Sequence, residues 1–428
     1  MAGFVNSEGR SVQDTVAAET KSIGFDYQYY YFLLKVIQLE KGETVGYEVK
    51  DDVHIDNNNG ELILIQLKHS IDNKSNLTEK DVDLWKTISN WIKIVNDENE
   101  GRTSLEDQIN YINKTTFLLV TNKGESSTNK FLELIEVFQN HKVTLSNIKE
   151  HLRKISKPIN EKDASKVDGY ISFLLSQNDS WLEHFFGKLR ILMKKESLIE
   201  EVKQAIKQKN VKESRVDDVF ASVDSNLRTF MFKTVTSRCK VNMNFETYYQ
   251  RFTKYFELGR STKLPIRPIN MDVSLPSNFR NHTFVRQLLD SEILSEDDAE
   301  FEDELISYFT SMMYMHNNEK EWLQKSEITK EELMALDKEA KIKWKNTFKR
   351  IHSELQIEFR KNGKDISKMD EEKLNILARN CYYAILDILL VLDDTELDTE
   401  LCNGKFYSLS DYPSIGWRFD WREKYTND

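Results

Sequence analysis

The sequence predicts an α/β region at the N-terminus followed by a largely α-helical remainder. Short apolar runs with strand-like composition occur within the first 124 residues. Beyond Lys123, apolar residues recur at steps of three and four, as on the buried face of a helix. The 428 residues include only 14 Gly and 5 Pro, which favours long helices over a turn-rich all-β design. The length itself suggests two or three packed units.

The α/β region is expected to run helix, strand, strand, helix, strand. Its first helix carries apolar residues at helical spacing and ends near Gly42. The two strands are separated by a turn made of one Asp, three Asn and one Gly. The last strand, TTFLLVT, has the continuous apolar character of a strand buried on both faces. The expected elements are helix 25–42, strand 46–55, turn 56–60, strand 61–69, helix 79–95 and strand 115–121.

The remainder is expected to consist of helices interrupted by one proline-rich segment. Three of the five prolines fall between residues 263 and 279, which predicts a linker or extended arm. The expected helices include 181–193, 216–235, 330–361 and 371–392. The expected domains are an α/β domain at 1–150, a basic helical domain for oligomerisation or DNA contact at 151–262, a linker at 263–282 and a C-terminal helical partner-docking domain at 283–428. The aromatic tail at 401–425 is expected to cap this last domain.

Charge is spread unevenly along the chain. The net charge of −11 argues against a uniformly basic nucleic-acid coat. By segment, residues 1–124 carry −7, 125–180 carry 0, 181–280 carry +8 and 281–428 carry −12. The basic middle could follow a DNA backbone, but such a series is more often a solvated helix face.

Other sequence features narrow the class of protein. Three scattered cysteines are too few for a disulfide framework or a thiolate zinc cage. There is no Walker-type phosphate loop, CxxC pair or HExxH, so nothing supports ATP hydrolysis or zinc chemistry. No signal-peptide pattern or apolar run long enough for a membrane span is visible. We therefore expect a cytoplasmic protein without membrane association.

One group of polar residues in the α/β region could carry chemistry. Residues two apart on a strand share a face, so Gln66 and Lys68 should project into the same space while Leu67 is buried opposite them. Asp52 joins them if the two strands pair. A carboxylate and a second oxygen ligand can hold Mg²⁺ or Mn²⁺, and a lysine can stabilise charge on a phosphate or help to deprotonate the attacking water. The pattern therefore suggests metal-dependent phosphodiester cleavage.

Strand alternation extends this candidate site. It places Glu48 on the face of Asp52, as a second metal ligand or as an ion-pair partner of Lys50 or Lys68. Asp51 falls on the opposite face and is a supporting residue or part of a solvated strand end.

Four segments together resemble a known nuclease family. They are GFDYQ at 24–28, EVKDDV at 48–53, IQLKH at 65–69 and FLLVT at 117–121. They resemble the PD-(D/E)xK superfamily in the branch where glutamine replaces the second acid, and most closely the double-stranded DNA endonuclease domain of CBASS and Lamassu antiphage effectors. The resemblance covers roughly the first 125 to 150 residues and implies a restriction-endonuclease-like fold.

In that family the aspartate, the glutamine and the lysine form the metal-dependent centre, which corresponds to Asp52, Gln66 and Lys68. Gln28 stands where related nucleases have an acid or amide on a helix. The resemblance implies a Lamassu-type complex in which an SMC-like ATPase and an accessory subunit restrain the nuclease, and in which the effector oligomerises on activation to cleave double-stranded DNA. Two alternatives remain open, namely a HerA-like ATPase partner and a non-catalytic DNA-binding or scaffold role.

Overall fold

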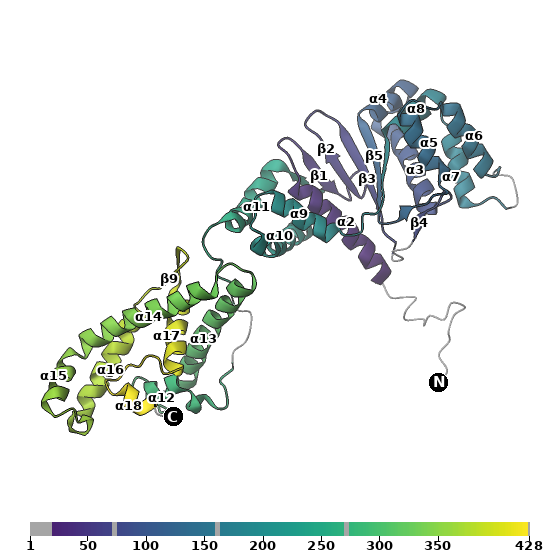
Figure 1. Ribbon diagram of the computed structural model, residues 1–428. Coiled ribbons are helices and arrows are strands. Elements are labelled where there is room, and N and C mark those ends of the chain that lie inside the picture. Colours follow the sequence, from purple (N-terminus) through teal and green to yellow (C-terminus); the bar gives the residue numbers. More distant parts are fainter. Residues whose placement is uncertain (1–18, 71–74, 159–162, 269–273, 427–428) are drawn as a thin grey trace, which may run out of the picture. The chain divides into compact units, whose positions relative to one another are not determined.

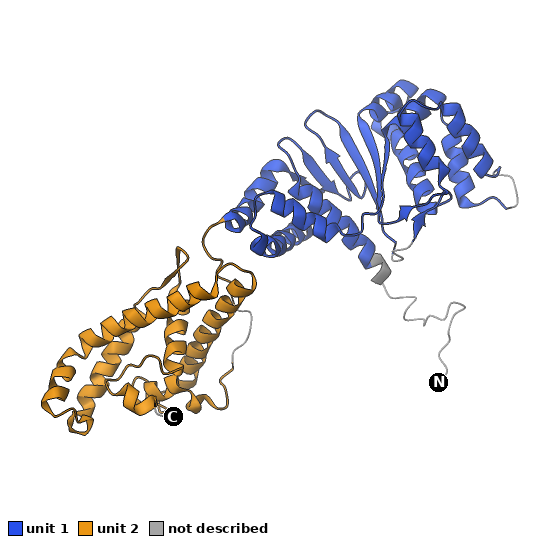
Figure 2. Ribbon diagram, viewed as in Figure 1, with its two compact units in different colours: residues 1–260 blue, residues 261–428 orange. Residues whose placement is uncertain are grey.

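The computed structural model describes residues 19–70, 75–158, 163–268 and 274–426. The chain forms two compact units, which divide between Arg260 and Ser261 (Figure 2). The expected boundary at residue 150 lies inside the first unit, and the basic helical segment 151–260 belongs to that same unit. Part of the expected linker, residues 269–273, lies outside the described residues.

A six-stranded mixed sheet forms the centre of unit 1, with the strand order β7-β5-β3-β2-β1-β8. Its strands are β1 (Thr44–Tyr47), β2 (Val53–Asp56), β3 (Leu62–Lys68), β5 (Thr115–Thr121), β7 (Leu189–Leu192) and β8 (Val241–Asn244). Strands β3, β5 and β7 run parallel, whereas β2, β1 and β8 extend the sheet in antiparallel pairs. A second, two-stranded parallel sheet joins β4 (Asn76–Leu77) to β6 (Gly124–Glu125).

Helices cover both faces of this sheet (Figure 1). One layer consists of α2 (Glu19–Ile37), α9 (Leu198–Gln208), α10 (Val216–Thr236) and α11 (Phe245–Arg260). The other consists of α3 (Val82–Val95), α4 (Leu105–Asn113), α5 (Lys130–Gln139), α6 (Leu145–Ile155), α7 (Lys166–Leu175) and α8 (Asp179–Lys188). Ile65 and Leu67 pack in the α2 layer and Leu64 in the α3 layer, so alternation along β3 turns Gln66 and Lys68 towards the α3 side.

The expected strand at 46–55 is wrong in one important respect. It is a hairpin, in which β1 and β2 are joined by a loop at residues 48–52. The loop closes through a hydrogen bond from the Glu48 N–H to the Asp52 carbonyl (2.9 Å). The local reason is that EVKDD contains a single apolar residue, and that the Asp51 carboxylate accepts the Asp52 N–H (2.9 Å), a local bond that competes with strand pairing.

Two sheet strands come from the segment that was expected to be helical. The expected helix 181–193 ends at Lys188 and continues as β7, which pairs with β5. Strand β8 follows α10 and pairs with β1. Four-residue strands such as LRIL and VNMN are too short for their periodicity to be distinguished from a helical turn, and their partners lie far away in the sequence.

Unit 2 is a helical domain that confirms the expected character of the C-terminal region. Its helices are α12 (Thr283–Asp290), α13 (Phe301–Gln324), α14 (Lys330–Ile351), α15 (Ser353–Lys361), α16 (Glu371–Leu386), α17 (Thr399–Asp411) and α18 (Trp421–Tyr425), with a hairpin of β9 (Val391–Leu392) and β10 (Thr395–Glu396). The expected helix 330–361 is divided at His352, and the expected helix 371–392 ends six residues early, before the hairpin.

The core of unit 2 includes much of the aromatic tail, among it Phe406, Tyr407, Trp417 and Trp421. The tail therefore completes the domain core, as the capping interpretation predicts. None of the helices in the part of the chain that the structure describes is both long and apolar enough to cross a membrane.

Candidate active site

The predicted polar residues lie where the β1–β2 loop meets the carboxyl end of β3. Val53, the first residue of β2, pairs with Ile65. Beyond Ile65, β3 therefore has no β2 residue beside it, and the loop at 48–52 takes that place. This arrangement leaves the edge of Gln66, Leu67 and Lys68 open to the loop.

Asp52 fills the gap that the end of β2 leaves. Its Oδ2 accepts the backbone N–H of Leu67 (2.7 Å) and the side-chain amide of Gln66. Leu67 is 3% exposed and Gln66 9% exposed, so both donors would otherwise be buried without a partner. The structure thus brings Asp52 and Gln66 together, although by a loop rather than by the continuous strand that was expected.

Asp51 points to the α3 side of the sheet and is not a solvated strand end. Its Oδ2 accepts a hydrogen bond from the indole N–H of Trp91 (2.7 Å). Burial raises the pKa of Asp51 to about 6, against the lowering effect of the Trp91 hydrogen bond and of the positive charge on Lys68. Asp51 is therefore a shielded carboxyl group that anchors the loop to α3.

Glu48 begins the loop in the left-handed conformation, with φ of 53°. Burial raises the pKa of its carboxyl group, the charge of Asp52 raises it further, and Lys68 lowers it. Glu48 therefore shares one electrostatic environment with Asp52 and Lys68. Of the two ion-pair partners considered for it, Lys50 pairs instead with Asp56 (2.5 Å).

Lys68 is half-buried at the end of β3. It forms no ion pair or hydrogen bond with another side chain in the described parts of the chain. Its ammonium nevertheless lowers the pKa of both Glu48 and Asp51, so it lies within electrostatic reach of the loop carboxylates. A lysine near acids but not fixed by them can still interact with a phosphate.

Gln28 is not joined to this cluster. It lies on α2, which packs on the sheet face opposite Gln66, and its Oε1 is buried without a hydrogen-bond partner among the described residues. The same helix does reach the end of β3, because the Tyr27 and His69 rings lie 5.0 Å apart. The structure thus places Gln28 near the region but assigns it no contact with Asp52.

The donor set suits a hard divalent cation. Mg²⁺ prefers oxygen ligands and is commonly held by one or two carboxylates while keeping several waters. Asp52, Glu48 and the Gln66 amide supply such oxygens. Burial, and then the negative charge of Asp52, raise the pKa of Glu48, and a bound cation would favour its ionised form. No cluster of three or more His, Cys, Asp or Glu arranged to hold a metal occurs among the residues described.

Several cations in the basic middle of the chain pair with nearby acids. Lys195 pairs with Glu201 (3.0 Å), Lys203 with Asp217 (2.9 Å) and Arg228 with Asp224 (3.2 Å). These are local, partly exposed pairs, which reduce the field available to a polyanion. They favour the interpretation of this segment as a solvated helix face.

Trp91 is the site residue that sequence reasoning missed. It lies in the expected helix 79–95, where its apolar ring suggested only a place in the core, and it is 1% exposed. A buried indole N–H needs a hydrogen-bond acceptor. The sequence could therefore have indicated that a polar group packs against α3 at Trp91.

Comparisons with known proteins add little to this geometry. No protein-family model matches the sequence, and no curated protein matches it. Among solved structures, the chain is similar to a Cap4 receptor from Moraxella osloensis that contains a SAVED/CARF domain, with a TM-score of 0.35 and 14% identity. The similarity covers 69% of this chain and 62% of that one. It is too low to establish a common fold.

Proposed function

We propose that this protein is a metal-dependent DNA endonuclease, and that it serves as the effector subunit of a bacterial antiphage defence complex. The observation that supports the proposal best is the convergence at the end of β3. Asp52 binds Gln66 and the Leu67 backbone there, and Lys68 projects from the same strand face as Gln66. The resemblance of the QxK segment to antiphage nucleases suggests the substrate, double-stranded DNA.

In this proposal Asp52 and Gln66 hold the cation, with Glu48 as a further ligand. A bound Mg²⁺ or Mn²⁺ would supply Lewis-acid stabilisation of the phosphate and a bound water of lowered pKa. Lys68 places a positive charge where negative charge develops on the scissile phosphate. Asp51 has a supporting role, because its bond to Trp91 fixes the loop that carries Asp52.

The charge distribution supports control by assembly. Residues 1–124 carry a net charge of −7, so the region that holds the candidate centre repels DNA unless a partner or an oligomer offsets this charge. We propose an SMC-like ATPase and an accessory subunit as the restraining partners, and oligomerisation of the nuclease on activation. A HerA-like ATPase is the alternative partner, and co-purification from the native host distinguishes the two.

The decisive experiment compares Lys68→Ala with Lys41→Ala in the complete complex. Lys41 is an exposed lysine in the turn before β1 and serves as the matched control. With linear and circular DNA and Mg²⁺, the K68A complex should lose cleavage, and the K41A complex should cleave as the wild type does. EDTA should abolish cleavage by the wild type. Undiminished cleavage by K68A would refute the assignment, and absence of cleavage in every activated wild-type complex would favour a scaffold role.

A further inference from the structure

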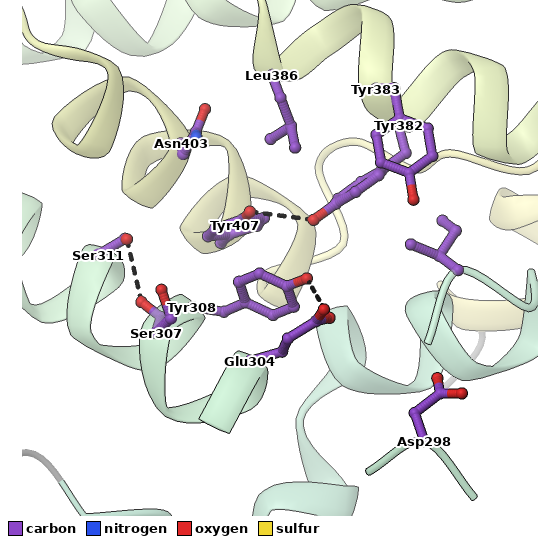
Figure 3. Close-up of a pocket in the computed structure, with 11 residues that line it drawn as sticks. Asp298, Glu304, Ser307, Tyr308, Ser311, Tyr382, Tyr383, Leu386, Asn403 and Tyr407 are labelled. Carbon is purple, nitrogen blue, oxygen red and sulfur yellow. Dashed lines mark hydrogen bonds between the residues drawn. The ribbon is translucent and has the colours of Figure 1, made fainter. Parts of the chain in front are cut away.

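Unit 2 contains a cavity of about 350 Å³, remote in sequence from the candidate nuclease centre. Helices α13, α16 and α17 supply most of its lining, and Ile293 and Asp298 complete it from the segment before α13 (Figure 3). This volume lies at the lower end of the range for small-molecule sites and far exceeds the space that one water needs.

The charged groups at this cavity are all acidic. Its lining includes the carboxylates of Asp298 and Glu304, and no Lys, Arg or His is among the described residues that line it. Both carboxylates are exposed, so they form a negatively charged rim. Such a rim attracts cations and repels phosphates and other anions.

Tyrosine side chains form the inner wall. The Tyr308 hydroxyl donates to Glu304 Oε2 (3.0 Å), and the hydroxyls of Tyr382 and Tyr407 lie 3.1 Å apart (Figure 3). The Tyr308 and Tyr407 rings are 5.1 Å apart. Neutral tyrosine rings present negative faces, which stabilise an organic cation better than they stabilise a neutral polar group.

The Glu304 carboxylate retains acceptor capacity beyond its bond to Tyr308. Asn403 also lines the cavity, from α17, but its Oδ1 is fully buried and is not accessible from the cavity. Glu304 is therefore the acceptor that a ligand with N–H donors would meet.

We propose that this cavity binds a small organic cation, an ammonium or guanidinium group, between the tyrosine wall and the Glu304 carboxylate. The group can belong to a free amine or guanidine, or to an arginine or lysine side chain of a partner subunit. The proposal concerns unit 2 alone and does not depend on nuclease activity in unit 1.

Isothermal titration calorimetry on the full chain tests the proposal with agmatine, spermidine and a capped Gly-Arg-Gly peptide as probes. At least one probe should bind, and tighter binding of the peptide than of agmatine identifies a partner side chain as the source. Glu304→Gln should weaken binding by roughly tenfold, because a charge-assisted hydrogen bond becomes a neutral one. Added salt should weaken binding further.

Glu302→Gln is the matched control, since Glu302 is an exposed acid in the first turn of the same helix and does not line the cavity. Its affinity for the probe should equal that of the wild type. No binding of any probe at millimolar concentration, equal binding by E304Q and wild type, or binding of inorganic phosphate in place of the cations would each overturn the proposal.

Discussion

Asp52 has a structural role that can be separated from its proposed metal-binding role. Its carboxylate satisfies two buried donors, the Leu67 N–H and the Gln66 amide. Asp52→Ala removes the acceptor from both, whereas Asp52→Asn keeps an oxygen in nearly the same position. Both substitutions remove the negative charge that would hold a metal ion.

The expected cost differs between the two variants. Leaving a buried donor unpaired costs about 1–3 kcal/mol, so D52A, which affects two donors, should lose about 2–5 kcal/mol of unfolding free energy. D52N keeps a neutral hydrogen bond to Leu67 and should lose about 1 kcal/mol or less. Removing the charge also relieves repulsion with Glu48 and Asp51, which further limits the cost of D52N.

Hydrogen exchange in a peptide covering β3, together with urea unfolding, measures this difference. In D52A the Leu67 amide should exchange roughly 30- to 4,000-fold faster than in the wild type, since each 1.4 kcal/mol corresponds to a factor of ten. In D52N the change should be less than about tenfold. DNA cleavage should be lost in both variants. Equal exchange and equal stability of D52A and D52N would refute the reasoning that Asp52 replaces the missing strand partner of β3.

Further predictions concern both units. Trp91→Phe should destabilise unit 1 by about 1–3 kcal/mol in urea unfolding, because the shielded Asp51 loses its donor; an unchanged midpoint would show that water replaces the indole. Gly404→Ala should lower the thermal midpoint, since a Cβ there would lie 2.0 Å from a carbonyl oxygen of α13, whereas Gly169→Ala, with open space around it, should be neutral or stabilising. Burial lowers the pKa of His352 from 6.5 to about 4. As pH falls, this histidine is therefore protonated at a higher pH in the unfolded chain than in the folded protein. The stability from this group is present above pH 6.5 and declines by about 3 kcal/mol as pH falls to 4. His352→Gln should flatten that part of the profile, and an equal slope in both proteins would contradict the assignment.

The candidate centre could be predicted from the sequence only in part. The i, i+2 spacing of Gln66 and Lys68 places them on one face of β3 whatever the rest of the fold does. The sequence could place Asp52 beside Gln66 only if the two strands paired. Asp52 does contact Gln66, but from the loop of a hairpin and not from a continuous strand. Alternation placed Asp51 on the face of Val53, opposite Gln66 and Lys68, and this prediction was wrong. The loop carries Asp51 to the α3 side of the sheet, where the Trp91 indole binds it.

The sequence by itself determined the α/β character of the first part, the helical character of the second and the residue types of the candidate centre, because these follow from local periodicity and composition. Tertiary structure alone decided that β7 and β8 belong to the sheet, since four-residue strands have no distinctive period and depend on distant partners. It also decided the extent of unit 1 and the shielding of Asp51, because both result from contacts between residues far apart in the chain. The cavity of unit 2 has the same origin, since three separate helices must pack before Glu304, Tyr382 and Tyr407 line one space.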